Sequence, residues 1–297
     1  MGSQVFLQHL ANGISLGSLY ALLAIGYTMV YGILRLINFA HGDIFMFGTY
    51  MAYYAITSFM LPWWLSFILA ILLTVIFGVM VERSAYKPLR NSPRISVMIS
   101  AIGASFLIEN VAIVVFGGRP KTFPVPEMFA KVLSLGEVSI VSVTLYTPVI
   151  TLLLLALLLY VVNKTKTGMA MRAVSKDYEA ARLMGIDVNR IISFTFAMGS
   201  GLAAVGGIMW GMKYPTLLPL MGMMPGLKCF IAAVVGGIGD IRGAVLGGFI
   251  LGLSEIMIIA FFPALTGYRD AIAFVLLIVI LLVKPTGLMG QNLTEKV

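Results

Sequence analysis

Nine long apolar stretches constrain this chain more than any other feature of its sequence. They cover residues 10–34, 42–60, 63–81, 96–116, 143–162, 191–211, 225–239, 243–262 and 269–283. A helix needs roughly 20 apolar residues to cross a hydrocarbon core of about 30 Å, and lipid cannot satisfy the hydrogen bonds of an irregular backbone. The sequence therefore predicts an all-α, polytopic transmembrane helix bundle with about eight to ten spans, in a single domain over residues 1–297.

The composition excludes several other classes of protein. Of the 297 residues, 60% are hydrophobic and 11% are charged, which excludes a water-soluble globule. One cysteine, Cys229, and two histidines, His9 and His41, leave no disulfide framework and no Cys/His metal cluster. We expect no metal and no cofactor. The net charge of +8 comes from basic residues between apolar stretches, so membrane lipid and not nucleic acid is the expected partner.

The basic residues are distributed unequally between the two sides of the predicted bundle. Lys and Arg gather in the loops at 82–95 and 163–190. Because cytoplasmic loops are enriched in these residues, we expect both loops and the C-terminus in the cytoplasm, and the N-terminus outside. The segment 117–142 is then the main external loop.

Two segments are predicted to be interrupted helices. The stretch 225–239 is too short to span comfortably, which favours a half-helix or a re-entrant segment. It runs into a glycine-rich break at 236–243, for which we favour a tight turn at the membrane surface with Asp240 as the cap of the helix that follows.

Segment 37–43 places Asn38, His41 and Asp43 beside a glycine at the edge of an apolar stretch. Transporters place such interruptions beside the translocation path, whereas an ordinary interfacial turn with Asp43 as a helix cap is the equally acceptable alternative.

Two acidic residues fall well inside apolar stretches. Glu109 and Glu255 would be costly there unless each faces a partner or water. Both are therefore candidates for the translocation path, together with Asn38, His41 and Asp43. The alternative is a neutral glutamate that hydrogen bonds between helices.

Small residues recur at four-residue spacing on several predicted helices. Since lipid gives no hydrophobic gain for helix association, such residues act by letting two backbones approach closely. We expect tight helix crossings at Gly13, Gly17 and Ala21, at Gly199, Ala203, Gly207 and Gly211, and at Gly239, Gly243, Gly247, Gly248 and Gly252.

The loop at about 163–190 contains a short predicted helix. Ser175 or Asp177 can cap its N-terminus, residues 179–184 favour helix, and Gly185 suits its end. Asp187 can cap the helix that follows. The predicted helix combines small and bulky apolar residues, so it can lodge in a groove of another protein or lie on lipid headgroups.

Four segments resemble known transport proteins. Glu179, Ala180, Ala181 and Gly185 resemble the coupling-loop signature of permease subunits of ATP-binding cassette (ABC) importers. Segments 36–43, 167–174 and 236–239 closely resemble branched-chain amino acid permeases of the LivH type. This resemblance extends from Asn12 to Gly287.

The resemblance implies a permease subunit of the bacterial inner membrane that translocates leucine, isoleucine and valine. It implies cytoplasmic ATP-binding subunits, a second permease of the LivM type and an extracytoplasmic substrate-binding protein as partners. The implied ATPase-coupling residues are Glu179, Ala180, Ala181, Leu183, Met184 and Gly185. No Gly-Lys dipeptide occurs, so there is no Walker A loop, and we expect a transport subunit and not an enzyme.

Other functions remain open at this stage. A proton-coupled secondary transporter would use Glu109 or Glu255. Related ABC permeases carry urea, amides or other amino acids. An intramembrane enzyme is disfavoured because Asn38, His41 and Asp43 are too close in sequence to enclose a substrate unaided.

Overall fold

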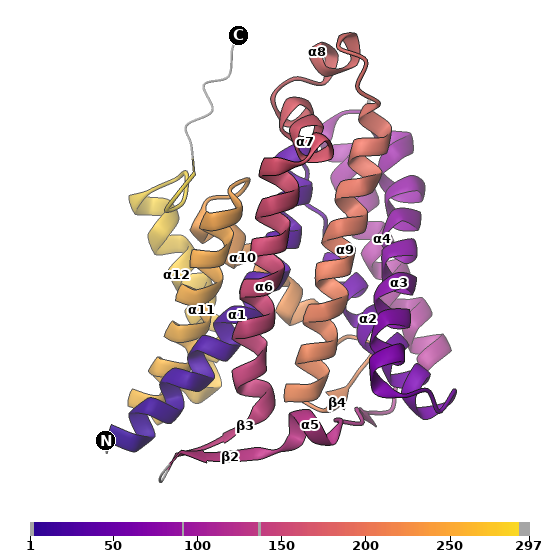
Figure 1. The fold of residues 1–297 in the computed structure, drawn as a ribbon. Helices are drawn as coiled ribbons and strands as arrows, with labels where there is room; N and C mark the ends of the chain where they lie inside the picture. The colour runs from indigo at the N-terminus through magenta and orange to yellow at the C-terminus, as the bar shows by residue number, and fades with distance from the viewer. Residues whose placement is uncertain (1–2, 91, 136–137, 291–297) are drawn as a thin grey trace.

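The computed structural model, which describes residues 3–90, 92–135 and 138–290, is a bundle of helices (Figure 1). Each of the nine apolar stretches forms one helix, so the all-α prediction is confirmed. These helices are α1 (Ser3–Leu34), α2 (His41–Thr57), α3 (Trp63–Val81), α4 (Arg94–Phe116), α6 (Ser142–Lys164), α9 (Val188–Lys213), α10 (Met223–Gly236), α11 (Ile241–Phe261) and α12 (Arg269–Val283).

Seven helical segments of the described chain are long and apolar enough to cross a membrane. The expected eight to ten spans are therefore corrected to seven full-length spans, the last of which, Pro263–Val283, joins α12 to the helical turn before it. The two remaining apolar stretches form α2, with 17 residues, and α10, with 14. At 1.5 Å per residue they are about 25 Å and 21 Å long, less than a hydrocarbon core of about 30 Å. We call α2 and α10 the half-helices.

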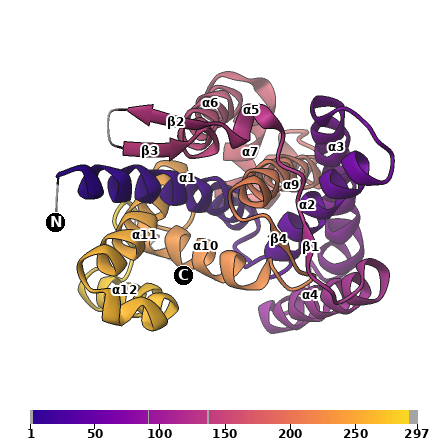
Figure 2. The same cartoon turned by 90° about the horizontal axis from the view of Figure 1, so that it is seen from below.

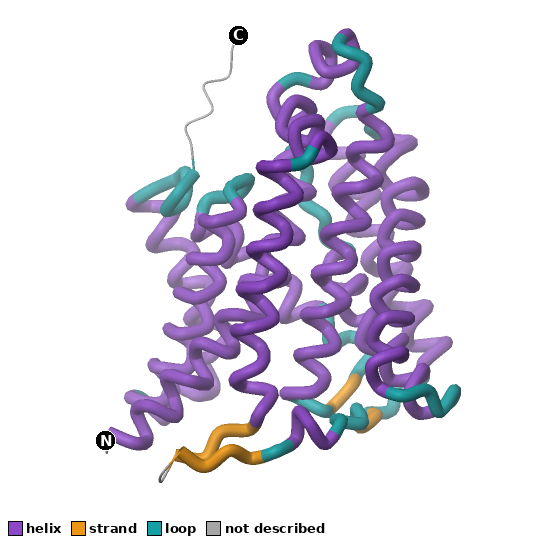
Figure 3. Tube along the Cα trace, viewed as in Figure 1, coloured by secondary structure: helices purple, strands orange, loops and turns teal. Residues whose placement is uncertain are grey.

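Shorter elements lie at the two ends of the bundle (Figures 1 and 3). One end holds the turns η1 (Glu82–Tyr86) and η2 (Lys87–Leu89) and the helices α7 (Lys166–Lys176) and α8 (Tyr178–Leu183). The other end holds β1 (Lys121–Thr122), α5 (Glu127–Ala130), β2 (Val132–Leu135), β3 (Val138–Val141) and β4 (Thr216–Leu217), while η3 (Pro263–Tyr268) connects α11 to α12. The antiparallel pairs are β1–β4 and β2–β3. The loops 82–95 and 163–190 thus share one end, opposite segment 117–142.

Helix α1 forms the centre of the bundle and is almost completely buried along its apolar length. It packs against α6, α9, α10 and α11, and Figure 2 shows it between α6 and α11. A methyl group on Gly252 would lie 2.2 Å from the backbone nitrogen of Gly17, and one on Gly248 would lie 2.6 Å from Cα of Ala21. The predicted small-residue crossing is confirmed, because any side chain there would separate α1 from α11.

The segments α1–α4 and α9–α12 repeat one packing order in opposite directions. Helix α1 leads away from the end that holds β2 and β3, whereas α9 leads toward it (Figure 1). The contact between α1 and α11 in one half corresponds to the contact between α9 and α3 in the other. The contact between α10 and α1 corresponds in the same way to the contact between α2 and α9. The half-helices therefore occupy equivalent places in two inverted halves, an arrangement that many transporters share.

Candidate functional site

The two half-helices start against each other inside the bundle. A methyl group on Gly42 would lie 2.4 Å from the carbonyl oxygen of Gly222, and one on Gly222 would lie 2.0 Å from the carbonyl oxygen of Gly42. His41, the first residue of α2, lies against Gly26 of α1. Since Gly26 precedes the end of α1 by roughly 12 Å of helix, the chain after α1 turns back into the bundle before α2 begins.

A cavity of about 180 Å³ lies between α2, α4 and α10, where the half-helices start. Its polar lining includes Asp43, Ser105 and Glu109. The Asp43 carboxylate is 3% exposed and accepts a hydrogen bond from the Ser105 hydroxyl at 2.5 Å. Glu109 is 8% exposed, and its carboxylate has no hydrogen-bond or ion-pair partner among the described residues. The cavity thus holds two carboxylates and no described basic side chain.

The structure brings two of the five path candidates to this cavity and places the other three elsewhere. Asn38 accepts a hydrogen bond from the Tyr86 hydroxyl at 2.8 Å. His41 packs edge-on against Tyr27, with 4.6 Å between the ring centroids. Both side chains are buried at the connection between α1 and α2, where they fix the start of α2.

Glu255, the fifth candidate, lies in a buried ion cluster that joins α1, α10, α11 and α12. Its carboxylate accepts hydrogen bonds from Tyr20 at 2.8 Å and Lys228 at 3.0 Å, and it pairs with Arg269. Lys228 also pairs with Asp270 at 2.7 Å. Sequence reasoning missed Lys228, although a lysine inside the short stretch 225–239 indicates a buried acidic partner.

Three side-chain caps shape the loop at 163–190. Thr165 caps α7 by accepting from the Gly168 N–H at 3.1 Å. Asp177 caps α8 by accepting from the N–H groups of residues 179 and 180 at 2.8 and 2.9 Å. Asp187 caps α9 by accepting from the N–H of residue 190 at 3.1 Å. The predicted caps Asp177 and Asp187 are confirmed, whereas α7 was not predicted.

Helix α8 projects beyond the bundle and carries an uncovered apolar tip (Figure 1). Leu183 and Met184 are 88% and 82% exposed, and Gly185 follows with a φ of +80°, which favours glycine. The opposite face is anchored, because Ala181 is buried and the Tyr178 hydroxyl donates to the Ile33 carbonyl. Burial raises the pKa of Tyr178, so this hydroxyl stays a donor at neutral pH.

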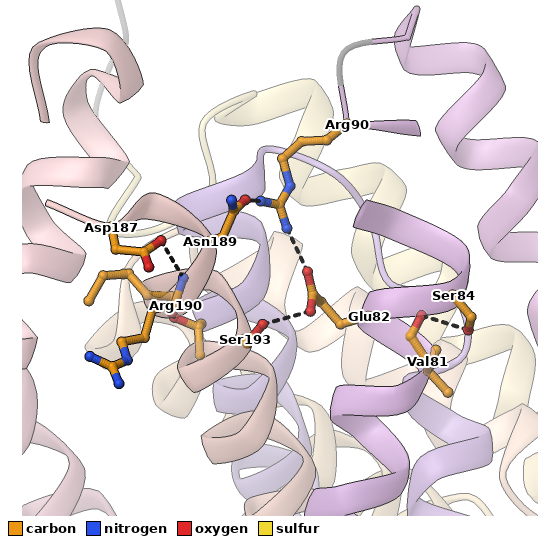
Figure 4. A network of polar contacts seen from close by, with 10 residues as sticks. Val81, Glu82, Ser84, Arg90, Asp187, Asn189, Arg190 and Ser193 are labelled. Atoms are coloured by element: carbon orange, nitrogen blue, oxygen red, sulfur yellow. Dashed lines mark hydrogen bonds and ion pairs between the residues drawn. The ribbon is translucent and has the colours of Figure 1, made fainter. Parts of the chain in front are cut away.

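A second polar network lies at the same end of the bundle (Figure 4). The fully buried Glu82 carboxylate accepts from Arg90 at 2.5 Å and from the Ser193 hydroxyl at 2.8 Å. Arg90 also donates to Asn189 at 2.5 Å. This network ties the turn after α3 to the start of α9. Sequence reasoning missed it, although an acid directly after the apolar stretch 63–81 was a signal.

These features define a class of protein. Two half-helices that start around a partly open cavity with acidic residues in its lining, within an inverted bundle of apolar helices, are typical of membrane transport proteins.

Comparison with known proteins identifies the family. Residues 9–281 match the family described as branched-chain amino acid transport system / permease component. The chain is 42% identical to the high-affinity branched-chain amino acid transport system permease proteins LivH of Salmonella typhimurium and BraD of Pseudomonas aeruginosa, with 98% of each chain covered. The chain belongs to this family, so it is a transport permease and not an enzyme. The resemblance to LivH-type ABC permeases is confirmed.

A solved structure supports the fold. A chain of PsaBC from Streptococcus pneumoniae in complex with Fab superposes with a TM-score of 0.51 at 13% identity, covering 94% of this chain and 92% of that chain. At this low identity the likeness concerns the fold alone.

Proposed function

We propose that this chain is the permease subunit that carries leucine, isoleucine and valine into a bacterial cell across the inner membrane. The substrates of its relatives support this assignment, because LivH and BraD align with the chain over 98% of their length. Its partners in the complex are cytoplasmic ATP-binding subunits, a second permease of the LivM type and an extracytoplasmic substrate-binding protein. Residues 1–297 act as one permease domain.

The proposed orientation places the end that holds α7 and α8 in the cytoplasm. The basic loops 82–95 and 163–190 lie at that end, in agreement with the positive-inside rule. The start of α1 then lies outside the cell. The C-terminal residues 291–297, which we expect in the cytoplasm, lie outside the described residues.

The exposed tip of α8 is the observation that carries the proposed coupling mechanism. Leu183 and Met184 are uncovered, while Asp177 caps α8 and Tyr178 holds it to the bundle. An apolar tip on an anchored helix suits a groove of another protein. When the ATPase closes, α8 would move as a lever on α6 and α9 and alternate the opening of the path. Glu179, Ala180 and Gly185 complete this coupling surface, and the buried Ala181 supports it by anchoring α8 to the bundle.

The proposed path passes the cavity that Asp43 and Glu109 line. Asn38 and His41 support it by fixing the start of α2, and Glu255 supports it by fixing α10 through Lys228. Movement of either half-helix start would change the shape of the cavity.

Crosslinking and uptake together test the coupling role. In a Cys229→Ala background, Met184→Cys should form a crosslink to a co-expressed ATP-binding subunit. Glu179→Ala and Gly185→Val should abolish ATP-driven leucine uptake while the protein remains inserted in the membrane. Glu127→Ala, at the opposite end of the bundle, is the matched control and should transport normally. Full uptake in both coupling variants, or no crosslink in an active preparation, would contradict the proposal.

A further inference from the structure

The cavity between α2, α4 and α10 is lined by two acidic side chains that no described basic side chain faces. Asp43 and Glu109 are its described charged lining residues. Asp43 has only a neutral donor, Ser105, and Glu109 is more than nine-tenths buried without a partner. A buried carboxylate is costly unless it meets a cation or a set of hydrogen-bond donors. This arrangement therefore points to a ligand that brings positive charge.

The remaining walls of the cavity are mainly apolar. Tyr27, Phe106, Leu227 and Phe230 contribute to them. The volume of about 180 Å³ is several times the roughly 30 Å³ that one water molecule occupies in the liquid. A few polar groups within an apolar lining are typical of sites for small organic solutes. A bare metal ion could bind the carboxylates but would make no contact that uses these apolar walls.

The third wall of the cavity carries partial positive charge. The first turn of α10 has no side-chain cap, and Gly222, Met223 and Gly226 line the cavity. The N–H groups of Met223 and Gly226 donate to the carbonyls of Leu220 and Gly222, and Pro225 has no N–H, so the helix dipole and not a set of free N–H groups supplies this charge. Helix N-termini attract carboxylates, and half-helix N-termini serve this purpose in transporters. The cavity is thus acidic on the side of α2 and α4 and electropositive at α10, which suits a zwitterion.

We propose that this cavity binds the ammonium group of an apolar amino acid between Asp43 and Glu109. The side chain of the amino acid lies against Phe106 and Phe230, and its carboxylate faces the first turn of α10. Ser105 is a positioning residue that orients the Asp43 carboxylate. The ammonium group donates charge-assisted hydrogen bonds to the two carboxylates and so supplies the positive charge that no described lining residue provides. This site rests on the proposed function for its solute and adds the chemistry that recognises it.

A cysteine reporter tests the site in the complete transporter in proteoliposomes. Ile102 lines the cavity. The reactivity of Ile102→Cys in a Cys229→Ala background therefore reports on the electrostatic potential in the cavity and on whether a solute occupies it. A cationic thiol reagent should modify this cysteine about tenfold faster than an anionic reagent of equal size. Leucine and isoamylamine should slow the modification, whereas isocaproate, which lacks the ammonium group, should not.

Variants separate this site from a general structural effect. Asp43→Asn and Glu109→Gln should remove the charge preference and the protection by leucine, while Glu127→Gln should retain both. Protection by isocaproate equal to that by leucine, protection that survives in both cavity variants, or no protection by leucine would overturn the site. If the same preparation accumulates leucine with ATP, such a failure concerns the site alone. If it does not accumulate leucine, the proposed function fails.

Discussion

Buried acids in the two inverted halves of the bundle differ in their partners. In the second half, Glu255 meets Lys228, Arg269 and Tyr20, so its charge is neutralised and α10, α11 and α12 are tied together. In the first half, Glu82 is likewise paired with Arg90, whereas Glu109 has no described partner and lines the cavity with Asp43.

This difference indicates separate roles for the acids in the two halves. Both halves pack their helices in the same order. Helix packing by itself therefore does not explain why the first half has acidic residues at positions 43 and 109. A fold that paired every buried acid would have a matching cation here. The second half therefore holds α10 in place, and the first half carries the acidic side chains that can contact a solute.

The largest expected effect contrasts the two glutamates. Glu255→Gln should lower the free energy of unfolding by about 3 kcal/mol, because the buried Lys228 then keeps only Asp270 as an acidic partner and the partly exposed Arg269 loses its carboxylate. Glu109→Gln should leave stability unchanged or raise it slightly, since no ion pair is lost. Thermal unfolding of the purified variants in detergent measures both. Equal losses would remove the distinction between the halves.

A smaller effect contrasts a close helix crossing with the loosely packed α4. Gly252→Ala places a methyl group 2.2 Å from the backbone of Gly17 and should cost about 1–3 kcal/mol. Gly103→Ala on α4 meets no atom within 4 Å and should be neutral or stabilising by up to about 1 kcal/mol, because alanine favours helix. The same unfolding assay reads both, and a destabilised Gly103→Ala would show that α4 packs closely.

The smallest effect concerns how helices begin. Helix α11 starts at an end of the bundle with Asp240 as its cap, which accepts from the Gly243 N–H at 2.8 Å. The half-helices start inside the bundle without side-chain caps. Asp240→Ala should cost about 1 kcal/mol, and Asp240→Asn should restore most of it. A loss that Asn does not restore would assign Asp240 a role other than capping.

Local features of the chain were predictable, and long-range ones were not. Hydropathy located all nine helices, and the sequence identified the caps Asp177, Asp187 and Asp240, because each depends on residues within a few positions. The contact of Gly42 with Gly222 depends on residues far apart in the chain, as does the pairing of Lys228 with Glu255. No local pattern encodes them, so the prediction could not separate Asp43 and Glu109, which line the cavity, from Asn38, His41 and Glu255, which do not.

The most direct test of the whole account is the energy source of leucine uptake. Proteoliposomes would contain this chain with its ATP-binding subunits and the second permease, supplied with the substrate-binding protein and radiolabelled leucine. The account predicts accumulation that requires ATP on the side of α8 and persists when an uncoupler collapses the proton gradient. Uptake that continues without ATP and stops with the uncoupler would contradict it, because a proton-coupled secondary transporter would then be the correct class.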